Sequence, residues 1–228
     1  IKYNPLLQCT ITITEEMALE QAKVLDAELA AGNYRGILHG IPYGVKDLMA
    51  VEGYKTTWGA EPYRNQQIEM TATVVEKLQA AGGVLVAKLV SGSLARGDVW
   101  FDGKTKNPWD TEQGATGSSA GSGSATSAGL VPFALGTETL GSITSPSNRN
   151  GITGLRPTYG RVSRHGVMSL SWSMDKVGPM ARSAEDCAIV YSVITGKDSK
   201  DGMTTDFPDG FEPKKDYKTL RVAYLKKD

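Results

Sequence analysis

The 228-residue sequence has few histidines, few cysteines and no excess of either charge, and each shortage argues against a class of protein. The two histidines, His39 and His165, are far apart, so neither a His-based triad nor a His-rich zinc centre is indicated. The two cysteines, Cys9 and Cys187, form no CxxC pair, which argues against a disulfide framework or a cysteine zinc site. The 25 basic residues balance the 25 acidic ones, so nucleic acid and anionic membrane surfaces are not expected partners. No apolar run is long enough to predict a membrane span.

The chain is long enough for one domain with its own core, and no repeat or linker divides it. We therefore expect a single domain over residues 1–228. The sequence starts at Ile1 and ends just after a strand-like segment, so we expect it to be a fragment. A cytoplasmic location is slightly favoured, a removed secretion signal is left open, and a homodimer is one assembly that the sequence allows.

Helical and strand patterns alternate along the chain, which predicts an α/β fold. Strands that closely follow helices are typical of crossover connections, so we expect a mixed, mostly parallel β-sheet covered by helices on both faces. Thr14 and Ser183 are the expected N-caps of two helices. Residues 91–112 are polar and aromatic, and we expect them to be irregular. Helices are expected at 14–32, 71–81, 122–129 and 183–196; strands are expected at 9–13, 41–45, 84–89, 131–135 and 220–225, with short strands or turns at 151–156 and 160–163.

Two blocks rich in glycine and serine, residues 114–129 and 136–147, flank the apolar run LVPFAL. Small side chains let backbone N–H groups converge on a small space, which suits an oxygen that becomes an anion during a reaction. Such stretches are otherwise typical of flexible linkers. The apolar run between them favours a folded core.

Four sequence blocks, in their order and spacing, resemble the amidase signature family. They are GVKD at 44–47, TGSSAGS at 116–122, GTETLGSITSPS at 136–147 and GLRPTYGRVSRHG at 154–166. The resemblance runs from about residue 14 to the end of the chain. The family's domain is about twice this length, so the chain is similar to its N-terminal half. The resemblance implies the family's fold and hydrolysis of a small-molecule carboxamide without metal or cofactor.

Carried over by motif, the resemblance implies a catalytic triad of Lys46, Ser118 and Ser142, with Ser118 in a cis peptide after Gly117. Ser142 is the expected nucleophile, and Ser118 would relay its proton to Lys46. A serine hydroxyl needs a base, and histidine is scarce here. Lysine is a base only when neutral, and lowering its pKa from about 10.4 to near 7 costs roughly 4–5 kcal/mol, which burial at a strand end can supply.

The resemblance also implies an oxyanion hole made by backbone N–H groups. Its expected members are Thr139, Leu140, Gly141 and Ser142. Where the family has glycine and arginine, this sequence has Leu140 and Thr144, and we expect the leucine side chain to narrow the site. Ser119 and Glu138 are expected to support the loops and to take no part in the chemistry.

Three other functions remain as alternatives. One lies within the same family: the glutamine-hydrolysing subunit of a tRNA-dependent amidotransferase, although Thr144 leans against this. A non-catalytic nucleotide-binding module is suggested by the glycines around Ser122, but no GK[ST] follows. The third is a non-catalytic scaffold that kept the fold.

Several other residues are interpreted without a role in the chemistry. The SxxK match from Ser173 to Lys176 has no accompanying KTG, so we take it as a chance match. Trp172 and Met174 are expected in the core. Both histidines are expected to be structural or at the surface.

Overall fold

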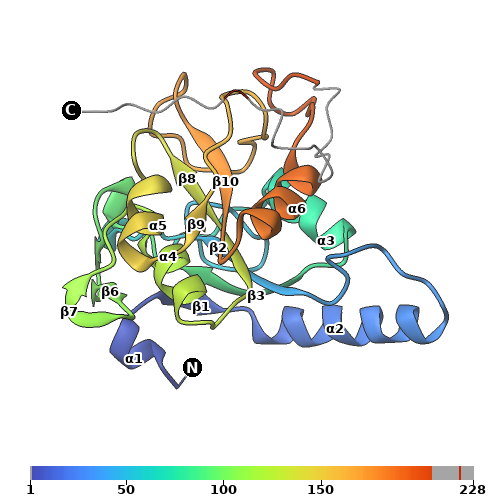
Figure 1. Cartoon of the computed structure of the whole chain (residues 1–228), viewed down its shortest axis with the longest axis horizontal. Helices are drawn as coiled ribbons and strands as arrows, with labels where there is room; N and C mark the ends of the chain where they lie inside the picture. The colour runs from blue at the N-terminus through green and yellow to red at the C-terminus, as the bar shows by residue number, and fades with distance from the viewer. Residues whose placement is uncertain (1, 207–220, 222–228) are drawn as a thin grey trace.

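A computed structural model of the chain (Figure 1) describes residues 2–206 and residue 221. The strand expected at 220–225 therefore lies outside the described residues, apart from one position. The helices are α1 (Asn4–Leu7), α2 (Glu15–Ala30), α3 (Thr73–Ala80), α4 (Ala120–Ser127), α5 (Thr144–Asn150) and α6 (Ala184–Ile194). The main strands are β1 (Thr10–Ile13), β2 (Pro42–Lys46), β3 (Val84–Leu89), β8 (Phe133–Glu138), β9 (Thr153–Gly154) and β10 (Lys176–Ala181).

These six strands form one sheet in the order β1-β3-β2-β8-β10-β9. The three central strands, β3, β2 and β8, run parallel to one another. β1 and β10 join them antiparallel, and β9 pairs antiparallel with β10. The predicted mixed α/β sheet is confirmed: its centre is parallel, and its outer strands are antiparallel.

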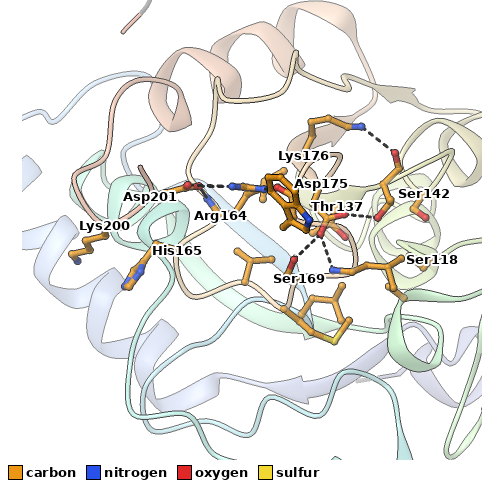
Figure 2. Close-up of a pocket in the computed structure, with 18 residues that line it drawn as sticks. Ser118, Thr137, Ser142, Arg164, His165, Ser169, Asp175, Lys176, Lys200 and Asp201 are labelled. Atoms are coloured by element: carbon orange, nitrogen blue, oxygen red, sulfur yellow. Dashed lines mark hydrogen bonds and ion pairs between the residues drawn. The ribbon is translucent and has the colours of Figure 1, made fainter. Parts of the chain in front are cut away.

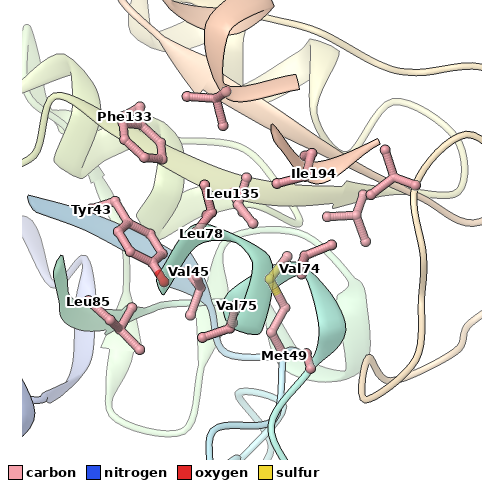
Figure 3. Close-up of a cluster of buried hydrophobic side chains, with 14 of the residues drawn as sticks. Tyr43, Val45, Met49, Val74, Val75, Leu78, Leu85, Phe133, Leu135 and Ile194 are labelled. Carbon is pink, nitrogen blue, oxygen red and sulfur yellow. The ribbon is translucent and has the colours of Figure 1, made fainter. Parts of the chain in front are cut away.

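Helices cover both faces of this sheet. On one face, α3 and α6 place Val74, Leu78 and Ile194 against side chains of β2 and β8 such as Val45 and Leu135 (Figure 3). On the opposite face, α4 packs Ala125 in a second cluster with Leu89 of β3 and Ala134 of β8. Because successive side chains of a strand point to opposite faces, the sheet contributes to a hydrophobic core on each face.

Two elements in the second half of the described chain, the strand β10 and the helix α5, were not expected from the sequence. β10 contains Gly178 and Pro179, residues that usually interrupt strands, yet it pairs along its whole length with β8. α5 begins inside the second serine-rich block, and its Pro146 is the third helical residue, where a missing N–H costs little. The stretch expected to be irregular also holds two small two-stranded sheets, β4 (Val99–Trp100) with β5 (Gly103–Lys104) and β6 (Lys106–Asn107) with β7 (Asp110–Gly114).

The two expected N-caps differ in outcome. The Ser183 side chain accepts a hydrogen bond from the Asp186 N–H at 3.0 Å, so this cap is confirmed. Thr14 precedes α2, but its hydroxyl donates to the Leu85 carbonyl at 2.7 Å and makes no capping hydrogen bond. A buried partner on β3 therefore competes successfully with the local cap.

None of the helices among the described residues combines the length and the hydropathy that crossing a bilayer requires. Of more consequence for function, β2 and β8 end side by side, and β10 begins opposite the end of β8, with Lys176 paired to Glu138. Residues at these three strand ends build the site.

Candidate active site

Lys46 is the last residue of β2, in the middle of the sheet, and its side chain is fully buried. Its Nζ lies 2.7 Å from Ser118 Oγ and 2.8 Å from Thr137 Oγ1. Burial lowers the pKa of Lys46 to about 7, although the charges of Asp175 and Glu138 oppose the shift. The amine is therefore neutral in a large fraction of molecules near pH 7, which is the state a base requires.

Ser118 lies just before α4, and its backbone is tightly enclosed. The Gly117–Ser118 peptide bond is cis, as the resemblance implied. A Cβ on Gly117 would lie 1.8 Å from the Gly97 carbonyl oxygen, so only glycine fits there. The Ser118 carbonyl accepts the Gly92 N–H at 3.1 Å. These contacts fix the hydroxyl of Ser118 against the Lys46 amine.

Ser142 lies in the loop between β8 and α5 and lines the same cavity of about 220 Å³ as Ser118. Ser118, Thr137 and Ser142 lie together at one end of the cavity, whereas Arg164, Lys200 and Asp201 lie at the other (Figure 2). The Ser119 N–H donates to the Ser142 carbonyl at 3.2 Å, which joins the two glycine-serine blocks. The structure thus brings the three predicted triad residues into one region.

Ser119 and Glu138 hold the loops around this region. The Ser119 hydroxyl donates to the Thr137 carbonyl at 3.1 Å and accepts the Thr137 N–H at 3.2 Å. Glu138 is fully buried, and its carboxylate accepts the N–H groups of Ile143 and Thr144 at 2.8 and 2.9 Å. Burial alone would raise the pKa of Glu138, but these N–H groups, that of Gly141 and the Arg156 side chain together lower it.

The four residues expected to form the oxyanion hole follow directly after β8. Gly141 has φ +84°, a conformation that suits glycine. Its N–H is one of those that lower the pKa of Glu138, so it faces a carboxylate already present in the protein. Leu140 is 79% exposed and is not among the residues that line the cavity, so the expectation that it narrows the site is wrong. Its backbone N–H is unaffected by where the side chain points.

Three contributors to the site were not singled out from the sequence, although one of them, Thr137, lies within the second glycine-serine block. Thr137 shares the Lys46 amine with Ser118. Asp175 accepts the Thr139 hydroxyl and the N–H groups of Leu170 and Ser171. Lys176, which ends the SxxK match, donates from Nζ to the Thr139 carbonyl at 3.0 Å. In the sequence, Asp175 and Lys176 belong only to the SxxK match, which was taken as a chance match.

The remaining cavity wall is partly apolar and partly charged. Trp172 is 73% exposed and lines the cavity, and Met174 is 43% exposed, so their assignment to the core is wrong. The Trp172 backbone carbonyl accepts hydrogen bonds from the Tyr159 hydroxyl and the Arg164 guanidinium, and these bonds hold the loop that carries Trp172. His165, expected to be structural or at the surface, also lines the cavity.

A second buried lysine lies beside the site. Lys88 on β3 is fully buried and forms an ion pair with the equally buried Asp47 at 2.8 Å. Its Nζ also donates to the Lys55 carbonyl and the Thr56 hydroxyl, each at 2.6 Å. Asp47 directly follows Lys46 in the chain, so this ion pair anchors the end of β2.

Comparison with known proteins gives consistent matches along the chain. A family model described as Amidase matches residues 1–228. The A subunit of glutamyl-tRNA(Gln) amidotransferase from Acinetobacter baumannii (strain AYE) is 46% identical over 206 residues, covering 89% of this chain and 42% of that protein. The corresponding protein of Roseiflexus sp. (strain RS-1) is 44% identical over 208 residues, covering 90% of this chain and again 42% of its own length.

Solved structures agree with these sequence matches. The native peptide amidase from Stenotrophomonas maltophilia is 38% identical, with a TM-score of 0.82, over 87% of this chain and 42% of that one. An amidase family protein from Bacillus anthracis str. Ames is 33% identical, with a TM-score of 0.83, over 87% and 41%. The chain spans about 42% of the length of the curated relatives it matches.

Proposed function

The chain belongs to the amidase family, and we propose that it hydrolyses linear carboxamides through an acyl-enzyme on Ser142. In this proposal Lys46 is the general base, and Ser118 relays protons between Lys46 and Ser142. Of the expected oxyanion-hole residues in the loop 139–142, those whose backbone N–H groups do not already face Glu138 stabilise the oxyanion. The substrate is a small-molecule amide.

The reaction has two halves. The Ser142 oxygen attacks the amide carbonyl as its proton passes to Ser118, whose own proton passes to the neutral Lys46 amine. When the tetrahedral intermediate collapses, the C–N bond breaks and the proton returns through Ser118 to the leaving nitrogen. Water then attacks the acyl ester by the same relay and releases the acid. Donors that face the developing oxyanion contribute about 3–4 kcal/mol each.

The observation that carries this proposal is the environment of Lys46. Its amine is fully buried and contacts hydroxyl oxygens, with Ser118 Oγ at 2.7 Å. A lysine with an ordinary pKa would be protonated and unable to accept a proton at neutral pH. Burial brings the pKa of this amine to about 7, so it is matched to base catalysis in that range.

The proposal is tested by covalent labelling with a fluorophosphonate. We expect the label on Ser142 and expect Ser142→Ala to abolish both labelling and amide turnover. Ser145→Ala is the matched control, because Ser145 is exposed and lies three residues further along the same segment. Undiminished labelling of the Ser142→Ala variant would remove Ser142 from the role of nucleophile.

A second candidate is the release of ammonia from glutamine for amidation of a tRNA-linked residue. The relatives named as A subunits of glutamyl-tRNA(Gln) amidotransferase support it, at up to 46% identity. This candidate uses the same triad with one particular carboxamide, and it would involve partner proteins.

A panel of amides separates the two candidates. Turnover of glutamine well above that of aliphatic, aromatic and peptide C-terminal amides would favour the second. Broad turnover with glutamine among the poor substrates would favour the first.

A further inference from the structure

Thr139, the first residue of the predicted oxyanion loop, is held at both of its oxygen atoms by Asp175, just before β10, and Lys176, the first residue of β10. Its hydroxyl donates to the Asp175 carboxylate. Its carbonyl oxygen accepts from Lys176 Nζ at 3.0 Å. The far end of the loop is held separately by the carboxylate of Glu138. We propose that Lys176 is a positioning residue, which fixes the plane of the Thr139–Leu140 peptide and so aims the Leu140 N–H as an oxyanion donor.

The geometry of the peptide unit supplies the first step. In a trans peptide the C=O and the following N–H point in opposite directions. A hydrogen bond that holds the Thr139 carbonyl towards Lys176 therefore holds the Leu140 N–H towards the other side. Among the described residues, no protein acceptor takes a hydrogen bond from this N–H. This N–H is therefore unpaired within that part of the chain, and in our proposal it donates to the substrate oxygen.

The conformation of the loop explains why a residue is needed to position its peptide groups. The loop leaves the sheet at Glu138 and contains Gly141 at φ +84°, so the sheet ladder does not orient its peptide groups. Preorganised donors contribute to catalysis because they need not reorient as charge develops. A loop peptide that rotates loses this advantage, even when its N–H remains nearby.

The placement of Lys176 fits a role within the protein. It lines the cavity but is only partly exposed, and its register partner across the sheet is Glu138. A lysine in this position keeps its stem along the strand and its ammonium group on the Thr139 carbonyl. A hydrogen bond from a charged donor to a carbonyl is stronger than one between neutral groups.

This inference rests on the proposed function, and the test compares ground-state binding with stabilisation of the tetrahedral state. Lys176→Met removes the donor and keeps the stem. We expect kcat to fall by about 10- to 100-fold with KM changed less than about threefold, because the lost interaction acts in the transition state. A boronic acid that forms an anionic tetrahedral adduct on Ser142 should bind more weakly by a similar factor.

Two further variants complete the design. Lys176→Arg keeps a charged donor and should recover most of kcat and of boronate affinity. Lys23→Met makes the same change on an exposed lysine of α2 and should leave both unchanged. If Lys176→Met does not fold, Lys176→Gln with the same readouts replaces it, with a smaller loss expected.

The outcomes distinguish the two proposals. Active wild-type protein with unchanged kcat in the Met variant overturns the role of Lys176 alone. A loss confined to KM, with kcat and boronate affinity retained, also overturns it, because Lys176 would then bind substrate directly. If the wild-type protein neither turns over any amide nor forms the boronate adduct, both the proposed function and this inference fail.

Discussion

Lys46 and Lys88 are both fully buried, but their nitrogen atoms have different neighbours. Lys88 Nζ lies 2.8 Å from the Asp47 carboxylate, so its charge is compensated. Burial lowers the pKa of Lys88, and the Asp47 carboxylate opposes this shift. Lys46 Nζ contacts two hydroxyls and, within the part of the chain that the structure describes, no carboxylate at ion-pair distance. Lys88 thus stabilises the fold through its ion pair. Burying the Lys46 amine lowers the stability of the protein, and the proposed role of Lys46 as a base explains why this cost is kept.

The same substitution at these two lysines should have opposite effects on stability. Lys46→Met should raise the free energy of unfolding by about 1–3 kcal/mol at pH 7, because the protein no longer buries an amine that is charged when unfolded. Lys88→Met should lower it by about 3–5 kcal/mol, because Asp47 is left buried without its partner. Urea unfolding of the two variants and the wild type measures both. If Lys46→Met destabilises the protein as much as Lys88→Met does, the interpretation that burying the Lys46 amine lowers stability would be contradicted.

The gain from Lys46→Met should also depend on pH in a defined direction. The amine's pKa is lowered from 10.5 to about 7, so the unfolded chain holds the extra proton between these values. The cost of burying Lys46 is therefore complete below about pH 7 and fades as the pH rises towards 10.5. The stability difference should be larger at about pH 6 than at about pH 9.

Labelling of Ser142 should follow the protonation of Lys46. The rate of reaction with a fluorophosphonate should rise with pH, with a midpoint near the Lys46 pKa of about 7, and then level off. The reason is that, in the proposed relay, only the neutral amine can accept the proton. Lys46→Met should label slowly at every pH, with no rise near pH 7. A midpoint close to 10.5 in the wild type would show that burial does not tune this amine.

The residue-level site could be predicted only in part. Lys46, Ser118 and Ser142 stand in recognisable sequence blocks, so their positions could be named in advance. Thr137 and Lys176 contribute through contacts across the sheet with residues 91 and 37 positions away, and no local pattern encodes those contacts. The role of these two side chains can be recognised only in the structure, where the end of β2, the end of β8 and the start of β10 lie together.

At the scale of elements, α4 shows why the first glycine-serine block consists of tiny residues. A Cβ on Gly121 would lie 2.2 Å from the Val90 nitrogen and 2.3 Å from the Cys9 carbonyl oxygen. The helix therefore packs on the backbone just after β3 and just before β1, closer than any larger residue allows. Because Ser118 lies two residues before α4, this close packing also sets the position of its hydroxyl.

Gly121→Ala should displace α4 and affect both stability and labelling. Backbone atoms cannot move aside cheaply, so we expect a loss of about 1–3 kcal/mol or more in the free energy of unfolding. Labelling of Ser142 should slow by at least about tenfold, since a small displacement of a catalytic group has a large kinetic effect. Gly202→Ala is the control, because a Cβ there meets nothing within 4 Å. Equal behaviour of the two variants would refute the close-packing argument.

Elements with strong periodicity could be predicted, whereas those stabilised by tertiary contacts could not. The strand expected at 84–89 occupies those residues as β3, because its apolar run follows two glycines and is almost entirely buried. No element was predicted for β10, whose Gly178 and Pro179 are residues that usually interrupt strands. In the structure, a Cβ on Gly178 would lie 2.1 Å from the Leu155 carbonyl oxygen, and the Pro179 carbonyl accepts the Leu155 N–H. Close strand packing therefore explains the glycine, which propensity alone cannot.

At the scale of the whole molecule, the candidate site exists only where distant segments meet. Lys46 ends β2, Glu138 ends β8 and Lys176 begins β10, while Ser118 precedes a helix on one face of the same sheet. Apolar clusters on both faces hold these strands together. The site therefore depends on the integrity of the entire sheet.

Loss of the site in urea should coincide with global unfolding. If the sheet unfolds as one cooperative unit, the rate of Ser142 labelling and the far-UV circular dichroism signal should give the same midpoint. Labelling in the Ser183→Ala variant, which loses the cap of α6 and about 1 kcal/mol, should shift to lower urea together with the dichroism signal. α6 packs on the face of the sheet opposite α4, so a joint shift would show that the site draws its stability from both cores. Labelling that disappears well before the dichroism signal changes would instead show that the glycine-serine loops open locally, independently of the sheet.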